Sequence, residues 1–462
     1  MKRLLSSAAI AIAATSLLSA TATQANITNI NASSNPVLYW NTFVLTLPGS
    51  PPAQSRAAAM INIAMHDAAN AALGSPDKTY LTGVSSSIGD PNVAVAQAAH
   101  DMLVSLNSSN AAAVQSYDNA LTSYLATIPN TAAKTNAIAT GAAYASQMLA
   151  VRSNDGSATA GFPATPYTPG SNPGDWNPTP PPPGGSANPA LPGWGQVTEF
   201  LIGNSDNFVP GAPPALNSAA YTAAYNEVKL IGAAGAPLNV RSLDQTNAAN
   251  WWNAATGTTW LQFGLDVAEA KNLSTLDNSA LFATLTSALA DAFIVGFDTK
   301  YTYNFWRPIT AIRAGDTDGN PLTAGDTTWN SLFPAPEHPS YLSTHSIASG
   351  AASTVLAAWF GNQPFGGNQF CETLINTNRC YTSFSGMAEE GSMSRVWGGI
   401  HFSFDTAAGL AAGRSVGSFI VSQNAFGAVP EPSTWTMLLV GFAAIGLRQR
   451  RRRLQGAIAQ LA

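Results

Sequence analysis

The most informative stretch of the sequence is Ser394-Arg-Val-Trp-Gly-Gly-Ile-His-Phe-Ser-Phe-Asp405, which places an arginine, a histidine and an aspartate at short intervals. Residues four apart share a face of a helix, so Asp405 is predicted to reach the ring of His401. A carboxylate on one imidazole nitrogen fixes the tautomer and leaves the other nitrogen free as a nucleophile or a ligand. The guanidinium of Arg395 offers paired donors that suit a tetrahedral oxyanion. This spacing predicts an anion-binding site.

Two earlier stretches supply further groups of the same kind. Lys300 and Arg307 lie seven residues apart in Lys-Tyr-Thr-Tyr-Asn-Phe-Trp-Arg-Pro, and this spacing predicts that both cations share one helix face. Ser343, Thr344 and His345 form a polar turn before an apolar run, where a hydroxyl and free amides at a helix start would bind an anion. Three cations, a hydroxyl and two histidines together predict a pocket for a phosphate-shaped ion.

Taken in chain order, the three stretches resemble the vanadium-dependent haloperoxidases and the type 2 phosphatidic-acid phosphatases. The pattern shared by these families is Lys-x6-Arg-Pro, then Pro-Ser-Gly-His, then Ser-Arg-x5-His-x3-Asp, and the first and third parts match throughout. The middle part departs from the pattern, because Thr344 replaces a glycine that lets a backbone amide approach the anion. Pro339-Ser340 echoes the motif, but its register would put Leu342 at the histidine position. The sequence therefore favours Ser343 and His345.

The resemblance implies a mainly α-helical fold of two four-helix bundles, with a long proline-rich loop and an anion site at the end of one bundle. No segment alternates strongly with period two, which also favours helices. The resemblance implies that His401 binds the vanadium of a vanadate cofactor. The implied catalytic residues are His345, His401 and Asp405, and the implied residues around the vanadate oxygens are Lys300, Arg307, Ser343, Thr344 and Arg395.

The favoured function is a vanadate-dependent haloperoxidase, which oxidises a halide with hydrogen peroxide to a hypohalous species. Phe305-Trp-Arg-Pro308 and His401-Phe-Ser-Phe-Asp405 look more like the haloperoxidase branch, and the body lacks the membrane spans of integral lipid phosphatases. An acid phosphatase remains the alternative, with His401 attacking phosphorus and His345 protonating the leaving oxygen. A non-catalytic envelope protein is the third interpretation.

The composition of the chain limits the kinds of molecule that it is expected to bind. The chain has 462 residues, of which 46% are hydrophobic and 10% charged, which is enough for a sizeable core. The formal net charge is −5, and the body is more acidic still, because several basic residues lie at the two ends. An acidic body disfavours nucleic acid as a partner.

Both ends read as targeting segments. Residues 1–25 combine Lys2-Arg3, an apolar run and small residues, which is typical of a signal peptide; a retained anchor is the alternative. Residues 429–453 combine Val-Pro-Glu-Pro, an apolar run and an arginine cluster, and resemble the PEP-CTERM sorting signal; a simple tail anchor is the alternative. This resemblance implies processing by an exosortase and export to the periplasm, cell surface or extracellular matrix of a Gram-negative bacterium. Membrane contact is expected only through this signal, and residues 454–462 form a tail.

The remaining body, residues 26–428, is predicted to be one helical catalytic region whose motifs span residues 300–405. Residues 26–50 are predicted to be an arm or coil, and residues 161–213 a long loop of polyproline character. Helices are predicted at 57–73, 93–106, 111–126, 131–152, 218–231, 245–255, 278–300 and 347–359.

Two further pairs of residues carry structural predictions. His66 and Asp67 are adjacent on a predicted helix and do not share a face, so a buried structural pair is favoured over a metal site. Cys371 and Cys380 are the only cysteines, and in an exported protein they are predicted to form a disulfide. The disulfide would brace the connection between the His345 and His401 segments.

Overall fold

The computed structural model describes residues 35–161, 167–179, 189–254, 256–374 and 377–427. The predicted signal peptide, sorting signal and tail lie outside these residues. The described chain is mainly α-helical, as predicted, and its one sheet has two antiparallel strands, β1 (Phe370–Leu374) and β2 (Thr377–Tyr381). The helices are α1 (Pro36–Val44), α2 (Pro51–Ala72), α3 (Pro91–Leu106), α4 (Ala111–Ala126), α5 (Ala132–Val151), α6 (Ala219–Ile231), α7 (Leu243–Trp251), α8 (Thr256–Lys271), α9 (Thr275–Tyr303), α10 (Pro308–Arg313), α11 (Thr344–Phe360), α12 (Phe384–Trp397) and α13 (Ser403–Gln423).

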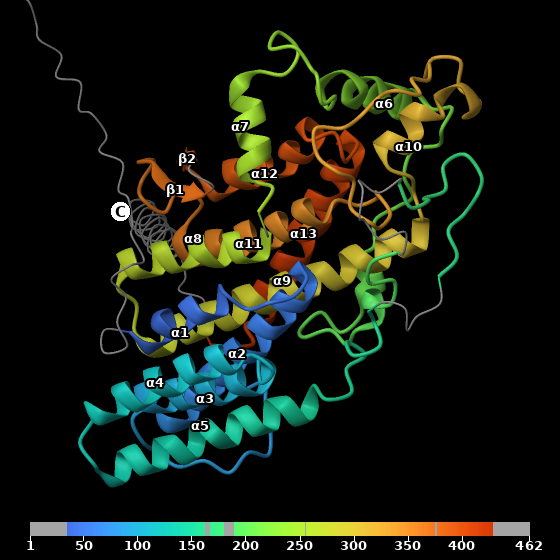
Figure 1. Ribbon diagram of the computed structural model, residues 1–462. Helices are drawn as coiled ribbons and strands as arrows, with labels where there is room; N and C mark the ends of the chain where they lie inside the picture. The colour runs from blue at the N-terminus through green and yellow to red at the C-terminus, as the bar shows by residue number, and fades with distance from the viewer. Residues whose placement is uncertain (1–34, 162–166, 180–188, 255, 375–376, 428–462) are drawn as a thin grey trace, which may run out of the picture.

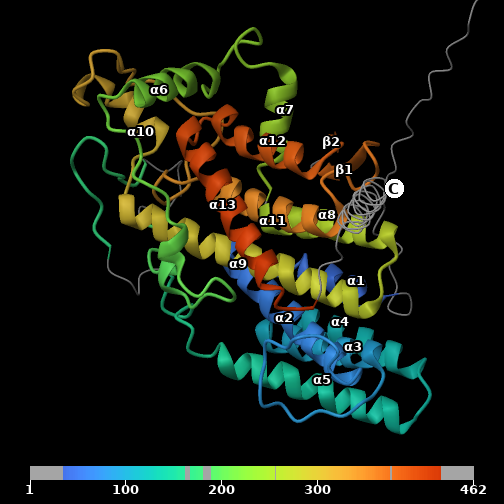
Figure 2. The ribbon, with the colours of Figure 1, turned by 180° about the vertical axis from the view of Figure 1, so that it is seen from behind.

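The long helix α9 lies at the centre of the fold. In both views α2 to α5 lie on one side of it, and α11 to α13 lie on the other (Figures 1 and 2). By length and composition α9 could span a membrane, but its apolar stretch is entirely buried within the protein. It is therefore the core helix against which both helical groups bury their apolar faces.

Helix α1 contradicts the prediction of an arm or coil at residues 26–50. The side chain of Asn35 accepts hydrogen bonds from the amides of Val37 and Leu38, and Pro36 occupies the first helical position. Asparagine at the cap followed by proline is a favourable helix start. Trp40 on this helix is fully buried. The proline content of the segment concealed a short, well-capped helix.

Two other local predictions are corrected. The helix expected at 245–255 ends at Trp251, and α8 begins at Thr256, where no separate helix was predicted. The Cys371–Cys380 connection is a β-hairpin, which was also not predicted. The two cysteines face each other directly across its strands, and the structure contains the disulfide between them.

The proline-rich loop packs back onto the turn between α9 and α10. The amide of Trp176 donates to the carbonyl of Asn304 at 2.7 Å, and the amide of Trp306 donates to the carbonyl of Gly174 at 2.9 Å. Further along, the amide of Ala190 donates to the carbonyl of Glu337 at 2.6 Å. The described parts of this loop are thus integral to the fold at the turn that separates the first two predicted cations.

Helices α11 and α13 pack unusually closely along a row of glycines on α13. A methyl group at Gly409 would come within 2.7 Å of the carbonyl oxygen of Ser343, and one at Gly413 would overlap the carbonyl of Ile347. Gly417 stands in the same relation to Ala351. Glycine at every fourth position leaves no side chain between the two backbones. This contact fixes the position of α13 relative to the start of α11.

Candidate anion-binding site

Lys300 and Arg307 do not lie on one helix, contrary to the prediction. Helix α9 ends at Tyr303, and Asn304 adopts a left-handed conformation with φ of 49°. Arg307 is the extended cap residue of α10, whose first residue is Pro308. Proline disfavours the helical conformation in the residue before it, and asparagine tolerates the left-handed region. The chain therefore turns between the two cations, and both are fully buried.

The ammonium group of Lys300 is held by backbone oxygens. Its Nζ donates to the carbonyl of Pro339 at 2.7 Å and to the carbonyl of Ser340 at 3.0 Å. Burial, and then the neighbouring charge of Arg307, lower the pKa of Lys300 well below its usual range. The segment before α11 therefore fixes this cation without neutralising it.

Arg307 connects the segment before α11 to the turn between α12 and α13. Its Nε donates to the carbonyl of His338 at 2.9 Å, and one terminal nitrogen donates to the carbonyl of Ile400 at 2.8 Å. The same terminal nitrogen lies 3.0 Å from Nε2 of His401, and the other lies 2.9 Å from Nδ1 of His338. Burial lowers the pKa of Arg307 to about 9.

His401 and Asp405 meet as predicted, but not on one continuous helix. Helix α12 ends at Trp397, Gly399 takes a positive φ of 76°, and α13 begins only at Ser403. His401 lies in the turn between them, and its Nδ1 is 3.0 Å from Oδ2 of Asp405. Gly398 and Gly399 provide the break between the two helices.

The neighbours of His401 fix one tautomer of its ring. Arg307 has only donors, so Nε2 must accept from it and carry a lone pair. Nδ1 then carries the hydrogen and donates to Asp405. Burial, followed by the charges of Arg307 and Lys300, lowers the pKa of His401 well below its usual range. The ring is therefore neutral, and its Nε2 lone pair faces the guanidinium of Arg307.

The carboxylate of Asp405 is bonded through one oxygen only. Oδ2 accepts from Nδ1 of His401, from the amide of Phe402 at 3.1 Å and from the hydroxyl of Ser340. Oδ1 is buried without a partner in the described protein. Burial raises the pKa of Asp405 to about 6.

Arg395 and His345 converge on the link between α7 and α8. Nε2 of His345 lies 3.1 Å from the carbonyl oxygen of Trp252, and a terminal nitrogen of Arg395 donates to the same oxygen at 3.3 Å. Two longer contacts of 3.5 Å join Arg395 to the side chain of Asn253. Burial lowers the pKa of Arg395 to about 10 and that of His345 well below its usual range. Nε of Arg395 is buried with no partner among the described residues.

Ser343 and Thr344 stand at the start of α11. The hydroxyl of Ser343 caps the helix by accepting from the amide of Ser346 at 3.4 Å, and its own amide donates to the carbonyl of Asp405 at 3.2 Å. Thr344 is the first helical residue, and its side chain is buried. The first amides of a helix have no acceptor within the helix. The start of α11 is therefore tied to α13 beside the His401–Asp405 pair.

Comparisons with known proteins match two parts of the chain. Residues 280–426 match the VCPO second helical-bundle domain, and residues 428–453 match the PEP-CTERM protein-sorting motif. The vanadium chloroperoxidase of Curvularia inaequalis is 23% identical over 206 residues. Residues 280–426 are thus similar to a domain of the vanadium haloperoxidases. The match covers 37% of this chain, and it spans only about a third (33%) of the length of the Curvularia enzyme.

Solved structures of vanadium-dependent haloperoxidases share the fold of this chain. The first bacterial vanadium-dependent iodoperoxidase superposes with a TM-score of 0.71 at 24% identity, over 85% of this chain and 97% of that protein. The holo form of a bacterial vanadium-dependent chloroperoxidase superposes with a TM-score of 0.61 at 16% identity, over 83% and 94%. At these identities the likeness establishes the fold.

The family sequence pattern missed several residues that contact the predicted site. Trp252 and Asn253 come from the α7–α8 link, and no sequence signal distinguishes them from other residues of a helix end. His338 and Ser340 flank Pro339, and both lie in the segment just before Ser343. The echo of the motif at Pro339-Ser340 was the only available sign that this segment also faces the site.

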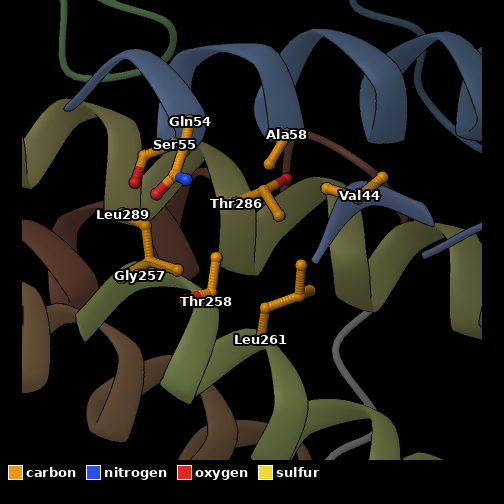
Figure 3. A pocket seen from close by; sticks show the side chains of 9 residues that line it. All are labelled: Val44, Gln54, Ser55, Ala58, Gly257, Thr258, Leu261, Thr286 and Leu289. Carbon is orange, nitrogen blue, oxygen red and sulfur yellow. The ribbon is translucent and has the colours of Figure 1, made fainter. Parts of the chain in front are cut away.

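Two of the cavities in the described residues lie beside α10 and between α1, α2, α8 and α9, and neither of these is lined by a predicted site residue. One of about 440 Å³ opens beside α10, lined by Thr179, Ile309, Arg313, Asn330, Ser331, Leu332, Phe333, Pro334, Ala335 and Glu337. The other, of about 10 Å³, lies between α1, α2, α8 and α9 and is lined partly by Ser55, Gly257 and Thr286 (Figure 3). The smaller cavity has room for one water molecule.

Proposed function

We propose that this chain binds vanadate and uses it to oxidise a halide with hydrogen peroxide. The observation that carries the proposal is the charge around Nε2 of His401. Lys300, Arg307 and Arg395 are buried. Among the described residues, Asp405 is the only carboxylate in contact with His401. Buried charges are costly unless they are compensated, so the pocket favours an anion with more than one negative charge.

The donors present fit vanadate. Nε2 of His401 carries the lone pair that a metal requires, and Asp405 holds the opposite nitrogen as carboxylates do for metal-bound histidines. Nε of Arg395 is a buried donor that has no acceptor among the described residues. Lys300, Arg307, Arg395, the hydroxyl of Ser343 and the amide of Thr344 would hold the oxygens. Vanadate bound there would supply Lewis-acid activation of hydrogen peroxide toward halide.

His345 would be the proton acceptor in the reaction with hydrogen peroxide. Its low pKa leaves the ring neutral near pH 7, so it would accept a proton from incoming hydrogen peroxide. It shares the Trp252 carbonyl with Arg395, which places the proton acceptor beside one of the cations. The positive charges would raise the reactivity of the bound group by stabilising developing negative charge.

The same geometry supports a phosphatase as the second candidate. A neutral histidine with one nitrogen on a carboxylate and the other free is also a nucleophile, and His401 would attack phosphorus. Phosphate and vanadate share shape and charge, so the pocket serves either reaction. A non-catalytic envelope protein is the weakest of the three proposals, because burying three cations without a ligand lowers stability.

Export supports a reaction outside the cytoplasm. The PEP-CTERM motif implies an exported, surface-sorted protein that is processed by an exosortase. We extend this to a periplasmic, cell-surface or matrix location, with residues 1–25 as the signal peptide. We also propose that residues 26–428 form one catalytic region, in which the site lies at the end of one of two helical bundles.

The test uses the purified full-length chain with and without orthovanadate. One assay follows bromination of a phenolic dye with hydrogen peroxide and bromide, and the other follows hydrolysis of p-nitrophenyl phosphate without vanadate. Vanadate-dependent bromination is the expected result. Hydrolysis that vanadate inhibits, without bromination, would establish the phosphatase instead. Folded protein that is inactive in both assays would contradict both enzymatic functions.

A further inference from the structure

Ser340 connects three parts of the candidate site through its three polar groups. Its carbonyl accepts from Nζ of Lys300 at 3.0 Å, and its amide donates to the carbonyl of Phe305 at 2.8 Å. Its hydroxyl donates to Oδ2 of Asp405 and lies 3.4 Å from Nδ1 of His401. The side chain is fully buried, so water does not compete for these bonds.

The hydroxyl matters because the hydrogen bonds to the Asp405 carboxylate within the described residues all go to one of its two oxygens. Oδ2 receives the bonds described above from Ser340, Phe402 and His401, whereas Oδ1 has no partner among the described residues. Rotation of the carboxylate is therefore limited only by donors on Oδ2. Of the three, His401 is the group to be positioned, so the fixed donors are one backbone amide and one hydroxyl.

We propose that Ser340 is a positioning residue, which orients the Asp405 carboxylate and thereby holds the His401 ring in place, with Nδ1 on Asp405 and Nε2 facing Arg307. The same residue fixes Lys300 through its carbonyl, so a single short segment sets the distance between a cation and the metal-binding nitrogen. The expected effect on vanadate affinity rests on the proposed function, whereas the expected effect on the His401 ring does not. Outer hydrogen bonds of this kind change metal affinity by roughly 10–100-fold.

The experiment compares Ser340→Ala with the full-length wild-type chain in two measurements. The nitrogen-15 signals of the His401 ring, assigned through a His401 variant, report the tautomer without any bound anion. Titration calorimetry with orthovanadate reports affinity. In the wild type Nδ1 is expected to be protonated, and in Ser340→Ala the Nδ1 signal is expected to shift, because the hydrogen bond from Nδ1 to the less restrained Asp405 carboxylate weakens. The vanadate Kd is expected to rise at least about tenfold.

The matched control is Ser279→Ala. Ser279 is also fully buried, but its hydroxyl donates only to the carbonyl of Leu276 in its own helix, at 2.7 Å. This variant loses the same atoms, and it should leave both the ring signals and the Kd unchanged. Thermal unfolding of both variants measures the stability that each loses.

Ser340→Cys keeps the proposal testable if the alanine variant does not fold. The thiol is a weaker donor than a hydroxyl, so an intermediate change in ring signals and affinity is expected. Ring signals identical to wild type, in a folded variant without the hydroxyl, would overturn the proposal. A wild-type chain that binds no vanadate would refute the cofactor while the ring signals still decide the role of Ser340.

Discussion

The molecule contains two buried histidine–aspartate pairs that look alike at short range. In one, Nδ1 of His66 lies 3.1 Å from Asp67, and in the other Nδ1 of His401 lies 3.0 Å from Asp405. Both histidine side chains are almost completely buried, and both aspartates accept backbone amides. The first pair lies within α2, and the second lies at the start of α13.

The two histidine–aspartate pairs differ in the residues that surround them. Asp67 accepts from the amides of Tyr80 and Leu81, and the His66 ring packs edge-on against Phe426 at 5.1 Å. The carboxylate of Asp77 lies 4.0 Å from Nε2 of His66. Nε2 of His401 instead accepts from the guanidinium of Arg307. The difference teaches that a histidine–aspartate pair favours an anion only where buried cations surround its free nitrogen.

Removing the ring at each position should give the largest contrast. His401→Ala is expected to abolish measurable vanadate binding, because the metal-binding nitrogen is lost. His66→Ala should leave the vanadate Kd within about twofold while lowering the free energy of unfolding by about 2 kcal/mol, since a buried hydrogen bond and packing are lost. Titration calorimetry and urea unfolding measure the two effects. Equal loss of binding in both variants would remove the distinction between the pairs.

A second contrast uses two arginines that are each 3% exposed, Arg395 and Arg152. Arg152 pairs with Asp155 at 2.9 Å, whereas no carboxylate contacts Arg395 in the described structure. Arg395→Met is expected to raise the stability of the anion-free protein by about 1 kcal/mol, because it removes an uncompensated buried charge. The same change should weaken vanadate binding by about 100-fold, as expected for loss of a charged donor.

Arg152→Met should behave in the opposite way. It leaves a buried carboxylate with one fewer partner, so the free energy of unfolding should fall by about 3 kcal/mol with no change in vanadate affinity. Thermal unfolding and calorimetry on both variants provide the comparison. A loss of stability in Arg395→Met would show that the Trp252 and Asn253 contacts already compensate its charge.

The smallest expected effect concerns His100, which has carboxylates on both sides instead of cations. Burial opposes its protonation, but hydrogen bonds to Asp101 at 2.8 Å and Asp118 at 2.9 Å outweigh burial and raise its pKa above 6.5. This contribution to stability is therefore fully present below pH 6.5 and is lost as pH rises through the folded-state pKa. Because the cluster is partly exposed, the effect should stay below about 1 kcal/mol.

Urea unfolding at several pH values between 5.5 and 8.5 measures the His100 contribution. The variant His100→Asn should flatten the pH dependence in this range, since asparagine carries no titrating proton. An unchanged pH profile in this variant would show that other groups dominate the titration. His401 should contribute a dependence of the opposite sign, because its folded-state pKa is lowered.

Much of the fold was predictable because periodicity and capping act locally. The helix predicted at 111–126 has those bounds in the structure, and Asn110 caps it as its sequence position suggests. Helix α1 was missed because two opposing signals, proline content and a capping asparagine, occur in one short segment. The hairpin at β1 and β2 was missed because two five-residue strands give too little alternation to detect.

Which residues meet at the candidate site was more predictable than how they are arranged. Motif spacing brought together Lys300, Arg307, Arg395 and the His401–Asp405 pair, although it wrongly assigned a shared helix in two places. The reason is that proline and glycine interrupt helices within both motifs. Ser340 and Trp252 could not be selected from sequence, because their roles depend on contacts between segments far apart in the chain.

The row of glycines on α13 determines where along this helix a larger side chain is tolerated. Gly409, Gly413 and Gly417 carry no charge and contact no proposed ligand, yet they set the separation of α11 from α13. A single methyl group at Gly413 would act as a wedge, and the hydrogen bond from the amide of Ser343 to the carbonyl of Asp405 would lengthen with it. Apolar substitutions two to three turns from His401 should therefore disturb chemistry as strongly as polar ones beside it.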